Sequence, residues 1–173
     1  MRRPPGTVAG MWVGLVSTLA RYGLAAVWLV SGWVKFSDPT QTVVAVRAYQ
    51  ILPTDWVRPF AAVFPVLELA LGLILLVGLA TRSAALVSAL GLVALVAAIA
   101  SAWARGLSID CGCFGGGGVV EGVDGRDYAI EIARDLGFLA MSIWLGVRPR
   151  TRFALGPGSR ASLSAVPQPS MAE

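Results

Sequence analysis

Histidine is absent from this 173-residue chain, and cysteine occurs only twice. Without histidine, the protein can form neither a histidine general base nor a histidine-ligated haem or zinc. Two cysteines alone also leave a four-ligand structural zinc site incomplete, so any metal would have to be shared with a partner protein. The reactive chemistry open to the chain is therefore narrow and centres on its two thiols.

Charged residues are scarce as well. They make up 14% of the chain, against about 25% in an average soluble domain, while 56% of the residues are hydrophobic. The mean hydropathy is +0.72. The net charge of +4 does not indicate nucleic-acid binding, because the arginines stand at the ends of apolar stretches and in the tails. This composition indicates a protein whose solvent is the lipid bilayer.

Four long apolar stretches occupy most of the chain, at about residues 11–36, 59–80, 83–103 and 128–147. Crossing the hydrocarbon core of a membrane takes about 20 helical residues, and backbone polar groups in lipid must be paired within the segment. The sequence therefore predicts an all-α, integral membrane four-helix bundle. Arg2 and Arg3 would also suit a cleaved signal peptide, but Arg21 interrupts the first apolar run, and this favours an uncleaved first helix.

The distribution of basic residues predicts the orientation. With four spans, both termini and the Thr81-Arg82 turn share one side of the membrane. That side carries Arg2, Arg3, Arg82, Arg148, Arg150, Arg152 and Arg160, and the other carries Lys35, Arg47, Arg58, Arg105 and Arg126. Because cytoplasmic loops are enriched in Lys and Arg, we expect residues 1–10 and the tail 149–173 in the cytoplasm of a multi-pass plasma-membrane protein.

The connecting segments differ in composition. Residues 37–58 are predicted to contain a short interfacial helix. Residues 106–127 include the glycine run 115–118 and are predicted to form a flexible loop on the extracytoplasmic side, where disulfides persist. The tail from Pro149 onward is rich in Pro, Ser, Gly and Arg and is predicted to be disordered.

Both cysteines stand in this glycine-rich loop, as Cys111-Gly112-Cys113. A disulfide between them would close a very small ring, whose strain makes the bond easier to reduce. Asp110 should oppose thiolate formation at Cys111, whereas Arg105 could favour it. Three interpretations remain open: redox or sulfur chemistry, structural or partner-bound thiols, and a metal shared with a partner.

Glu68 lies near the middle of the second apolar stretch. An acidic residue at the bilayer centre costs about 2.5–3.5 kcal/mol on insertion scales, so Glu68 is expected to face the bundle and to have a basic partner. Arg21 is the predicted partner, with Lys35 and Arg134 as the other candidates. Glu68 could serve as a polar clamp between helices or as a contact for a proton or a quinone.

Four charged residues, Asp127, Glu131, Arg134 and Asp135, open the fourth apolar stretch. Positions 127, 131 and 134 share one helical face, and acidic residues suit a helix start. A solvated helix end explains the first of them. Arg134 and Asp135 lie deep enough to face the bundle or the loop above it.

Several motifs carry a resemblance to a known family. They are Ser31-Gly32-Trp33-Val34-Lys35-Phe36-Ser37-Asp38-Pro39, Ala48-Tyr49-Gln50-Ile51-Leu52-Pro53, Pro65-Val66-Leu67-Glu68, Gly78-Leu79-Ala80-Thr81-Arg82 and Asp110-Cys111-Gly112-Cys113-Phe114-Gly115. Over about residues 15–147 this order resembles the DoxX-like membrane proteins, most closely their MauE branch (methylamine utilisation protein E).

The resemblance implies a four-helix membrane protein that supports maturation of the disulfide-rich small subunit of methylamine dehydrogenase, beside a thioredoxin-like partner. DoxX relatives are linked to sulfur oxidation and quinone-coupled reactions. By position, the resemblance implies that Cys111, Cys113 and Glu68 are the functional residues.

We therefore expect the two cysteines to exchange electrons with a thioredoxin-like or disulfide-containing extracytoplasmic protein, with a quinone as the candidate electron carrier and no metal. Two rival functions remain. The protein could be a non-enzymatic membrane scaffold for a soluble oxidoreductase, or a small-molecule transporter with Glu68 in its site. The absence of an inverted repeat or a broken helix in the sequence disfavours transport.

Overall fold

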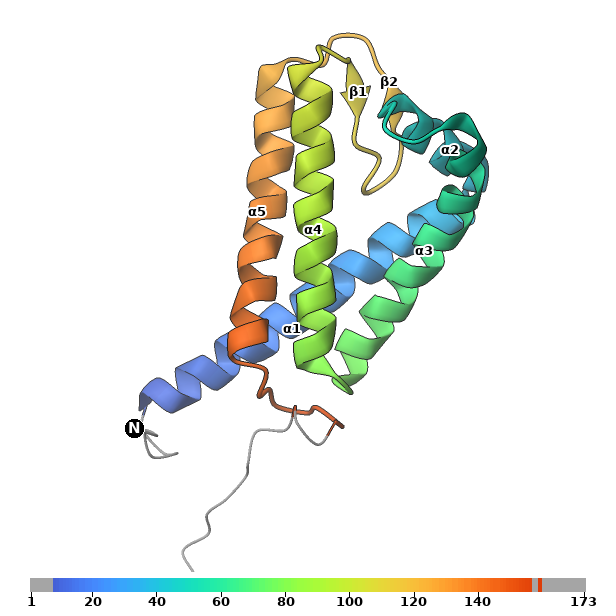
Figure 1. Ribbon diagram of the computed structural model, residues 1–173. Coiled ribbons are helices and arrows are strands. Elements are labelled where there is room, and N and C mark those ends of the chain that lie inside the picture. The colour runs from blue at the N-terminus through green and yellow to red at the C-terminus, as the bar shows by residue number, and fades with distance from the viewer. Residues whose placement is uncertain (1–7, 157–158, 160–173) are drawn as a thin grey trace, which may run out of the picture.

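The computed structural model describes residues 8–156 and residue 159 (Figure 1). Within these residues the chain is almost entirely helical. Its elements, in chain order, are α1 (Val8–Ser37), α2 (Pro39–Ala48), α3 (Thr54–Val77), α4 (Thr81–Ala104), β1 (Ile109–Asp110), β2 (Gly118–Val119) and α5 (Gly125–Val147). The antiparallel strands pair Ile109 with Val119 and Asp110 with Gly118, and they form a small hairpin beside the upper end of α4 (Figure 1).

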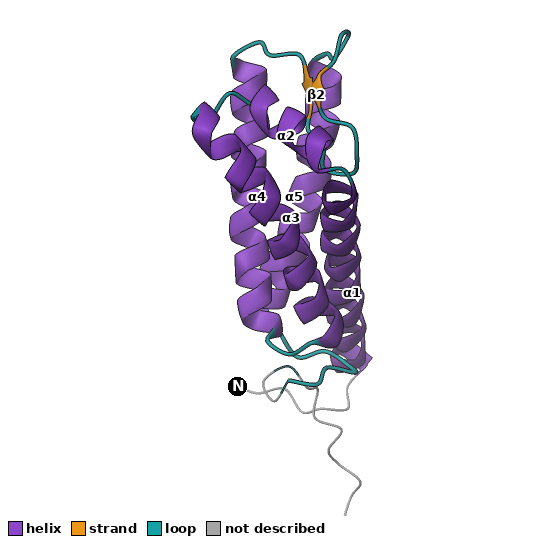
Figure 2. Cartoon of the chain, turned by 90° about the vertical axis from the view of Figure 1, so that its right-hand side faces the viewer, coloured by secondary structure: helices purple, strands orange, loops and turns teal. Residues whose placement is uncertain are grey.

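Four long helices lie together, with the short helix α2 and the hairpin at one end (Figures 1 and 2). Helix α1 packs mainly against α3, and α4 packs mainly against α5. Helices α3 and α4 meet at the turn between them and diverge toward the hairpin (Figure 1). One apolar core joins α1, α3, α4 and α5 below, and a second lies beneath the hairpin and includes both cysteines.

Three of the described helices are long and apolar enough to cross a membrane: Gly10–Ser37, Thr54–Val77 and Thr81–Ala104. They agree with the first three predicted spans. Helix α5 forms where the fourth span is predicted, but Glu131, Arg134 and Asp135 lie in its first half, and its crossing of the membrane stays a prediction. Large apolar side chains such as Leu19, Leu67 and Leu90 are exposed on the outer faces of the helices, as expected of surfaces that contact lipid. The protein is thus a multi-pass membrane protein.

Two glycines set the spacing between α1 and α3. A Cβ atom on Gly72 would lie 2.7 Å from Cγ of Leu29, and one on Gly32 would lie 2.9 Å from Cγ of Leu69. Only glycine permits an approach this close, as at many helix contacts in membranes. The antiparallel helices are thereby held with residues 29–35 of α1 level with residues 68–72 of α3.

The short helix predicted within residues 37–58 is present as α2, and its interfacial position stays a prediction. Asp38 caps it, because its side chain accepts a hydrogen bond of 2.9 Å from the backbone N–H of Gln41, and Pro39 occupies the first turn. The Gln41 side chain in turn donates a 2.6 Å hydrogen bond to the carbonyl of Gly117. Helix α2 is therefore fastened to the loop that carries the cysteines.

The glycine run 115–118, predicted to be flexible, packs closely against α2. A Cβ atom on Gly117 would lie 2.7 Å from Cβ of Ala45, and one on Gly118 would lie 2.9 Å from Cγ1 of Val44. The two carboxylate oxygens of Asp110 accept hydrogen bonds from the backbone N–H groups of Gly112 and Gly117, at 3.1 and 3.4 Å. The glycines permit the backbone to approach the helix closely.

The prediction of disorder from Pro149 onward is wrong for the first residues of the tail. The N–H of Arg152 donates to the hydroxyl of Thr18 at 3.1 Å, and the N–H of Gly156 donates to the carbonyl of Gly78 at 3.0 Å. Hydrogen bonds to the Thr18 hydroxyl of α1 and to carbonyls at the C-terminal end of α3 thus hold residues 152–156, which composition alone does not reveal. The rest of the predicted tail, and residues 1–7 of the predicted N-terminal segment, lie outside the described residues.

Candidate functional site

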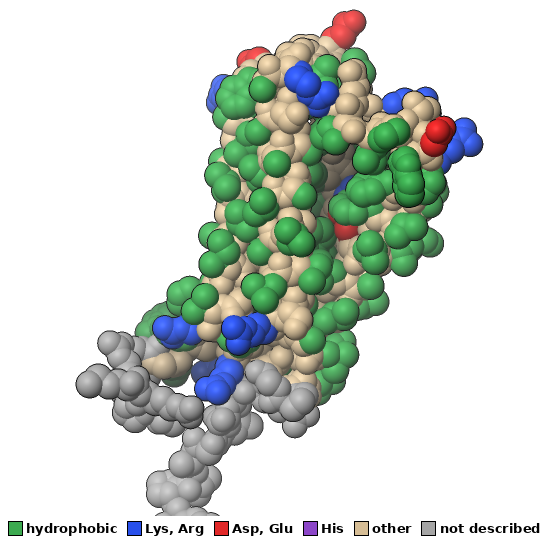
Figure 3. All heavy atoms as spheres, viewed as in Figure 1, with side chains coloured by type: hydrophobic (Ala, Val, Ile, Leu, Met, Phe, Trp, Pro, Cys, Tyr) green, Lys and Arg blue, Asp and Glu red, His purple; other side chains and the backbone are tan. Residues whose placement is uncertain are grey.

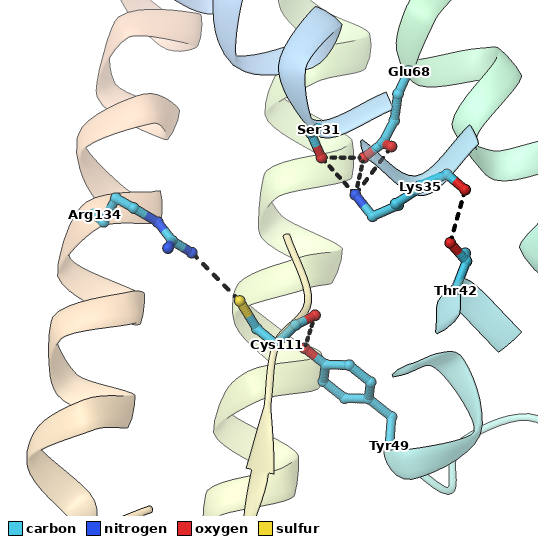
Figure 4. Close-up of polar contacts among 7 residues, drawn as sticks. All are labelled: Ser31, Lys35, Thr42, Tyr49, Glu68, Cys111 and Arg134. Atoms are coloured by element: carbon cyan, nitrogen blue, oxygen red, sulfur yellow. Dashed lines mark hydrogen bonds and ion pairs between the residues drawn. The ribbon is translucent and has the colours of Figure 1, made fainter. Parts of the chain in front are cut away.

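Glu68 faces the interior, as predicted, and pairs with Lys35. The Lys35 ammonium lies 2.8 Å from Oε1 and 3.0 Å from Oε2 of Glu68 (Figure 4). The Ser31 hydroxyl donates to Oε1 at 3.0 Å and accepts a hydrogen bond from Lys35. Glu68 is 4% exposed, so this ion pair stands within the protein and neutralises its own charge.

The predicted pairing of Glu68 with Arg21 is wrong. Arg21 is fully buried, and its guanidinium donates 3.0 Å hydrogen bonds to the carbonyls of Leu75, Leu76 and Arg152. Because α1 and α3 run antiparallel, Arg21 lies level with the C-terminal end of α3, well below Glu68. A cation at that end binds unpaired carbonyls and suits the helix dipole. Arg21 therefore joins α1, α3 and the C-terminal segment.

Cys111 and Cys113 are both free and buried beneath the hairpin. The guanidinium of Arg134, on α5, donates to Sγ of Cys111 at 3.7 Å (Figure 4). Arg134 also donates to Oδ1 of Asp135 at 3.0 Å and lies over the ring of Phe114, 5.1 Å from its centroid. The sequence-predicted residues Arg134 and Asp135 thus belong to the cysteine site.

The pKa values of the two thiols are shifted in opposite directions. A hydrogen bond from the Cys113 thiol, together with one from Arg134, holds the pKa of Cys111 below its usual value despite burial. The hydrogen bond to Cys111, together with burial, raises the pKa of Cys113. Cys111 is therefore the more readily ionised thiol of the pair.

Tyr49 supports the motif from the end of α2. Its hydroxyl donates to the carbonyl of Cys111 at 3.3 Å (Figure 4). Burial raises the pKa of Tyr49, so the phenol stays protonated and remains a donor. Arg105, predicted to favour the Cys111 thiolate, instead donates to the carbonyls of Ser101, Tyr49 and Gln50. Arg134 takes the position predicted for Arg105, because α5 packs beside the loop while the end of α4 turns toward α2.

A single cavity of about 790 Å³ brings these groups together. Both cysteines line it, as do Lys35, Glu68 and Asp135. The rest of its wall is largely apolar and comes from all five helices and the segment after α2, with the loop 111–116 above. The intramembrane ion pair and the thiol pair, treated separately at the level of sequence, thus face one space.

Among the residues that the structure describes, one group of side chains could hold a metal ion: single ligand atoms of Asp110, Cys111 and Glu131 all lie within 4.8 Å of one another. Both oxygens of Asp110 already accept loop N–H groups, and Sγ of Cys111 already accepts the Arg134 guanidinium. A cation there would compete with a fixed positive charge. We therefore assign no metal to this group.

Sequence reasoning did not assign site roles to Ser31, Tyr49, Phe114 and Glu131. A signal exists for Ser31, which precedes Lys35 by four residues and so shares its helical face. For Tyr49 and Phe114 no local pattern indicates the contact, because each meets the site through packing of separate elements. Asp127 lies apart from the site and closes the capping box of α5 with Asp124.

Comparison with known proteins agrees with this architecture. A family model described as methylamine utilisation protein MauE matches residues 13–148, from α1 to the end of α5. No curated protein and no solved structure matches the chain. Because the match spans all four long helices and the cysteine loop, the chain belongs to the MauE family, and it is a multi-pass membrane protein associated with methylamine utilisation.

Proposed function

We propose that the protein carries out thiol–disulfide exchange within the membrane, with Cys111 and Cys113 cycling between dithiol and disulfide during maturation of a disulfide-containing extracytoplasmic enzyme. The family setting of methylamine utilisation supports an enzyme of that pathway as the client. The observation that carries the proposal is the contact of Arg134 with Cys111, with Cys113 as second donor. It makes one thiol a nucleophile and leaves the other to resolve the intermediate.

The exchange balances with these two residues alone. The Cys111 thiolate attacks one sulfur of a client or partner disulfide, the S–S bond breaks, and one thiolate leaves. Cys113 then attacks Sγ of Cys111, which releases the second thiolate and forms the Cys111–Cys113 disulfide. Run in reverse, the same steps oxidise client thiols and reduce the pair. A thiolate stabilised by Arg134 favours the reduced pair and hence this oxidising direction.

The proposed topology places the exchange outside the cytoplasm of the plasma membrane. In it, α5 crosses the membrane with the three apolar helices, both termini are cytoplasmic, and the hairpin is extracytoplasmic. Support comes from the greater number of basic residues on the side of the termini. Since both cysteines are buried, a thioredoxin-like partner reaches them only when the hairpin moves away from α2.

Trapping the intermediate tests this function. In intact cells quenched with acid and alkylated, the Cys113→Ser variant should accumulate a mixed disulfide through Cys111, because the resolving thiol is missing. The Cys111→Ser variant should accumulate much less, since Cys113 is a weak nucleophile. Both variants should reach the membrane at normal abundance and fail to support client maturation.

Full client maturation by both variants would remove the exchange function and favour the scaffold, in which the protein anchors a soluble oxidoreductase. The observation that favours this second function is the burial of both free thiols. A transporter has less support, because Glu68 is neutralised by Lys35 within the wall of the cavity.

A further inference from the structure

We propose that the cavity is the binding site of a lipid-soluble quinone, which enters from the bilayer between α3 and α4 and oxidises the Cys111–Cys113 dithiol. This inference rests on the proposed exchange function and names its electron acceptor. It is argued from the opening of the cavity, the charge state of its wall, an unpaired polar atom and an adjoining groove.

The cavity opens sideways, between two helices that are apolar enough to cross a membrane. Helices α3 and α4 diverge above their connecting turn, and a hollow lies between them, with side chains of both charge signs visible inside it (Figure 3). The lining residues Ile51, Phe60, Ala94 and Ala97 are exposed and apolar, and they form its rim. An opening with such a rim admits a molecule dissolved in lipid more readily than one dissolved in water.

The buried charges in the wall are paired before any ligand arrives, and the remaining charged lining residue, Asp38, is exposed and caps α2. Lys35 pairs with Glu68 at 2.8 Å, and Arg134 pairs with Asp135 at 3.0 Å. An ionic guest would lose its hydration without gaining an unpaired counter-charge from either pair. The wall therefore suits an uncharged molecule with a few polar atoms, as most small-molecule sites do.

One polar atom in this wall has no partner. Asp135 is 1% exposed and lines the cavity, and its Oδ2 makes no hydrogen bond with any described residue, while Oδ1 accepts from Arg134. A buried acceptor left unpaired is costly, so it indicates a donor on a ligand. Ser31 and Lys35 also line the cavity, but their donors are already bound within the Glu68 pair. A ring whose carbonyls become hydroxyls on reduction would, as the quinol, donate a hydrogen bond to Oδ2.

A second, smaller groove of about 270 Å³ adjoins the rim and shares Leu52 and Phe60 with the cavity. Its remaining lining residues are Trp56, Pro59 and Val63, all apolar. It lies along the outer side of α3, where lipid is expected. This groove can hold the isoprenoid tail of a quinone whose ring lies in the cavity. A small soluble disulfide has no such tail and would leave the groove empty.

The redox step balances. Counted from the fully protonated dithiol, the pair loses two electrons and two protons as the Cys111–Cys113 bond forms: one proton leaves when Cys111 ionises, and the other comes from the S–H bond of Cys113. The quinone takes up both electrons and both protons and leaves as the quinol through the same opening. Electrons from client thiols would thus reach the membrane pool of carriers, and the pair would be ready for another client.

The test uses the full-length protein, reduced and freed of reductant, in lipid nanodiscs with decylubiquinone as the probe. We expect one quinol to appear, by ultraviolet absorbance, for each pair of thiols lost. Ala98→Phe places a ring in the cavity, whereas Ala100→Phe places the same ring on the exposed side of α4 as the matched control. Ala98→Phe should weaken decylubiquinone binding about tenfold, equivalent to about 1.4 kcal/mol, and Ala100→Phe should not.

A parallel oxidation with hydroxyethyl disulfide separates this inference from the proposed function. If this soluble disulfide oxidises the pair while decylubiquinone neither binds nor oxidises it, the quinone site is overturned and the exchange function stands. If neither reagent oxidises the pair, the exchange function itself fails. Equal rates with decylubiquinone for both alanine variants would place the reaction outside the cavity. Should Ala98→Phe not fold, a photoreactive quinone on the wild type must label α3 or α4 peptides that line the cavity, and labelling elsewhere would refute the site.

Discussion

The ammonium of Lys35 lies 2.8 Å from a carboxylate oxygen of Glu68 and joins α1 to α3 within the apolar interior. Both side chains are largely shielded from solvent, with 14% and 4% of their surfaces exposed. Removing one member of a buried pair leaves an uncompensated charge, whereas replacing both by apolar residues is often tolerated.

The first prediction concerns this pair. Lys35→Met alone and Glu68→Leu alone should each lower the free energy of unfolding by about 3–5 kcal/mol, and the double variant should recover most of that loss. Unfolding in mixed detergent micelles, followed by circular dichroism, measures the effect. A double variant no more stable than the single ones would show that the ion pair is not what links these residues.

Arg134 is predicted to control the reactivity of Cys111. Because the guanidinium contributes to the low pKa of Cys111, Arg134→Met should raise that pKa and reduce the thiolate fraction at neutral pH. In a Cys113→Ser background, alkylation of Cys111 by iodoacetamide at pH 7 should slow severalfold and recover as the pH rises. Arg105→Met is the matched control, since Arg105 binds backbone carbonyls away from the sulfur. Equal slowing in both variants would assign the effect to loss of general positive charge.

The orientation of the protein can be read from two exposed positions at opposite ends. In a Cys111→Ser/Cys113→Ser background, Val119→Cys places a thiol on the hairpin and Phe153→Cys places one in the C-terminal segment, where the native side chains are 79% and 82% exposed. A membrane-impermeant maleimide should label the first in intact cells and the second only after permeabilisation. The reverse pattern would invert the topology.

Access to the cysteines is predicted to depend on the contact between α2 and the loop. Gln41→Ala removes the hydrogen bond to the carbonyl of Gly117, which is worth about 1 kcal/mol, so opening of the hairpin should become about fivefold more frequent. The rate at which a small maleimide modifies Cys111 reports that opening. Thr40→Ala, on the exposed part of α2, should leave the rate unchanged. If Gln41→Ala also leaves it unchanged, the cysteines are reached by another route, such as the opening between α3 and α4.

Features that depend on neighbouring residues were predictable from the sequence. Three membrane-crossing helices follow from the length and hydropathy of continuous stretches, and α2 follows from the loop composition with Asp38 and Pro39 before it. The inward orientation of Glu68 follows from the cost of a charge in lipid. Each of these arguments needs only a short window of the chain.

The partners within the site were not predictable in this way. Arg21 and Lys35 are both basic residues of α1. Which of them lies beside Glu68 depends on how the antiparallel helices α1 and α3 are aligned along their length, and the close contacts at Gly32 and Gly72 set that alignment. Similarly, Arg105 is nearer to Cys111 in the chain than Arg134, yet the packing of α5 beside the loop gives Arg134 the contact.

By itself, the sequence determined that this protein belongs in a membrane and that two thiols are its candidate reactive groups, because composition settles which solvent and which functional groups are available. Only the tertiary structure decided that Cys111, Cys113 and the Lys35–Glu68 pair line one cavity, and that the first residues of the tail pack against α1 and α3. The physical reason is that these contacts join residues from separate helices. Their geometry depends on how closely the helices approach and at what level they meet, and no local stretch of sequence contains that information.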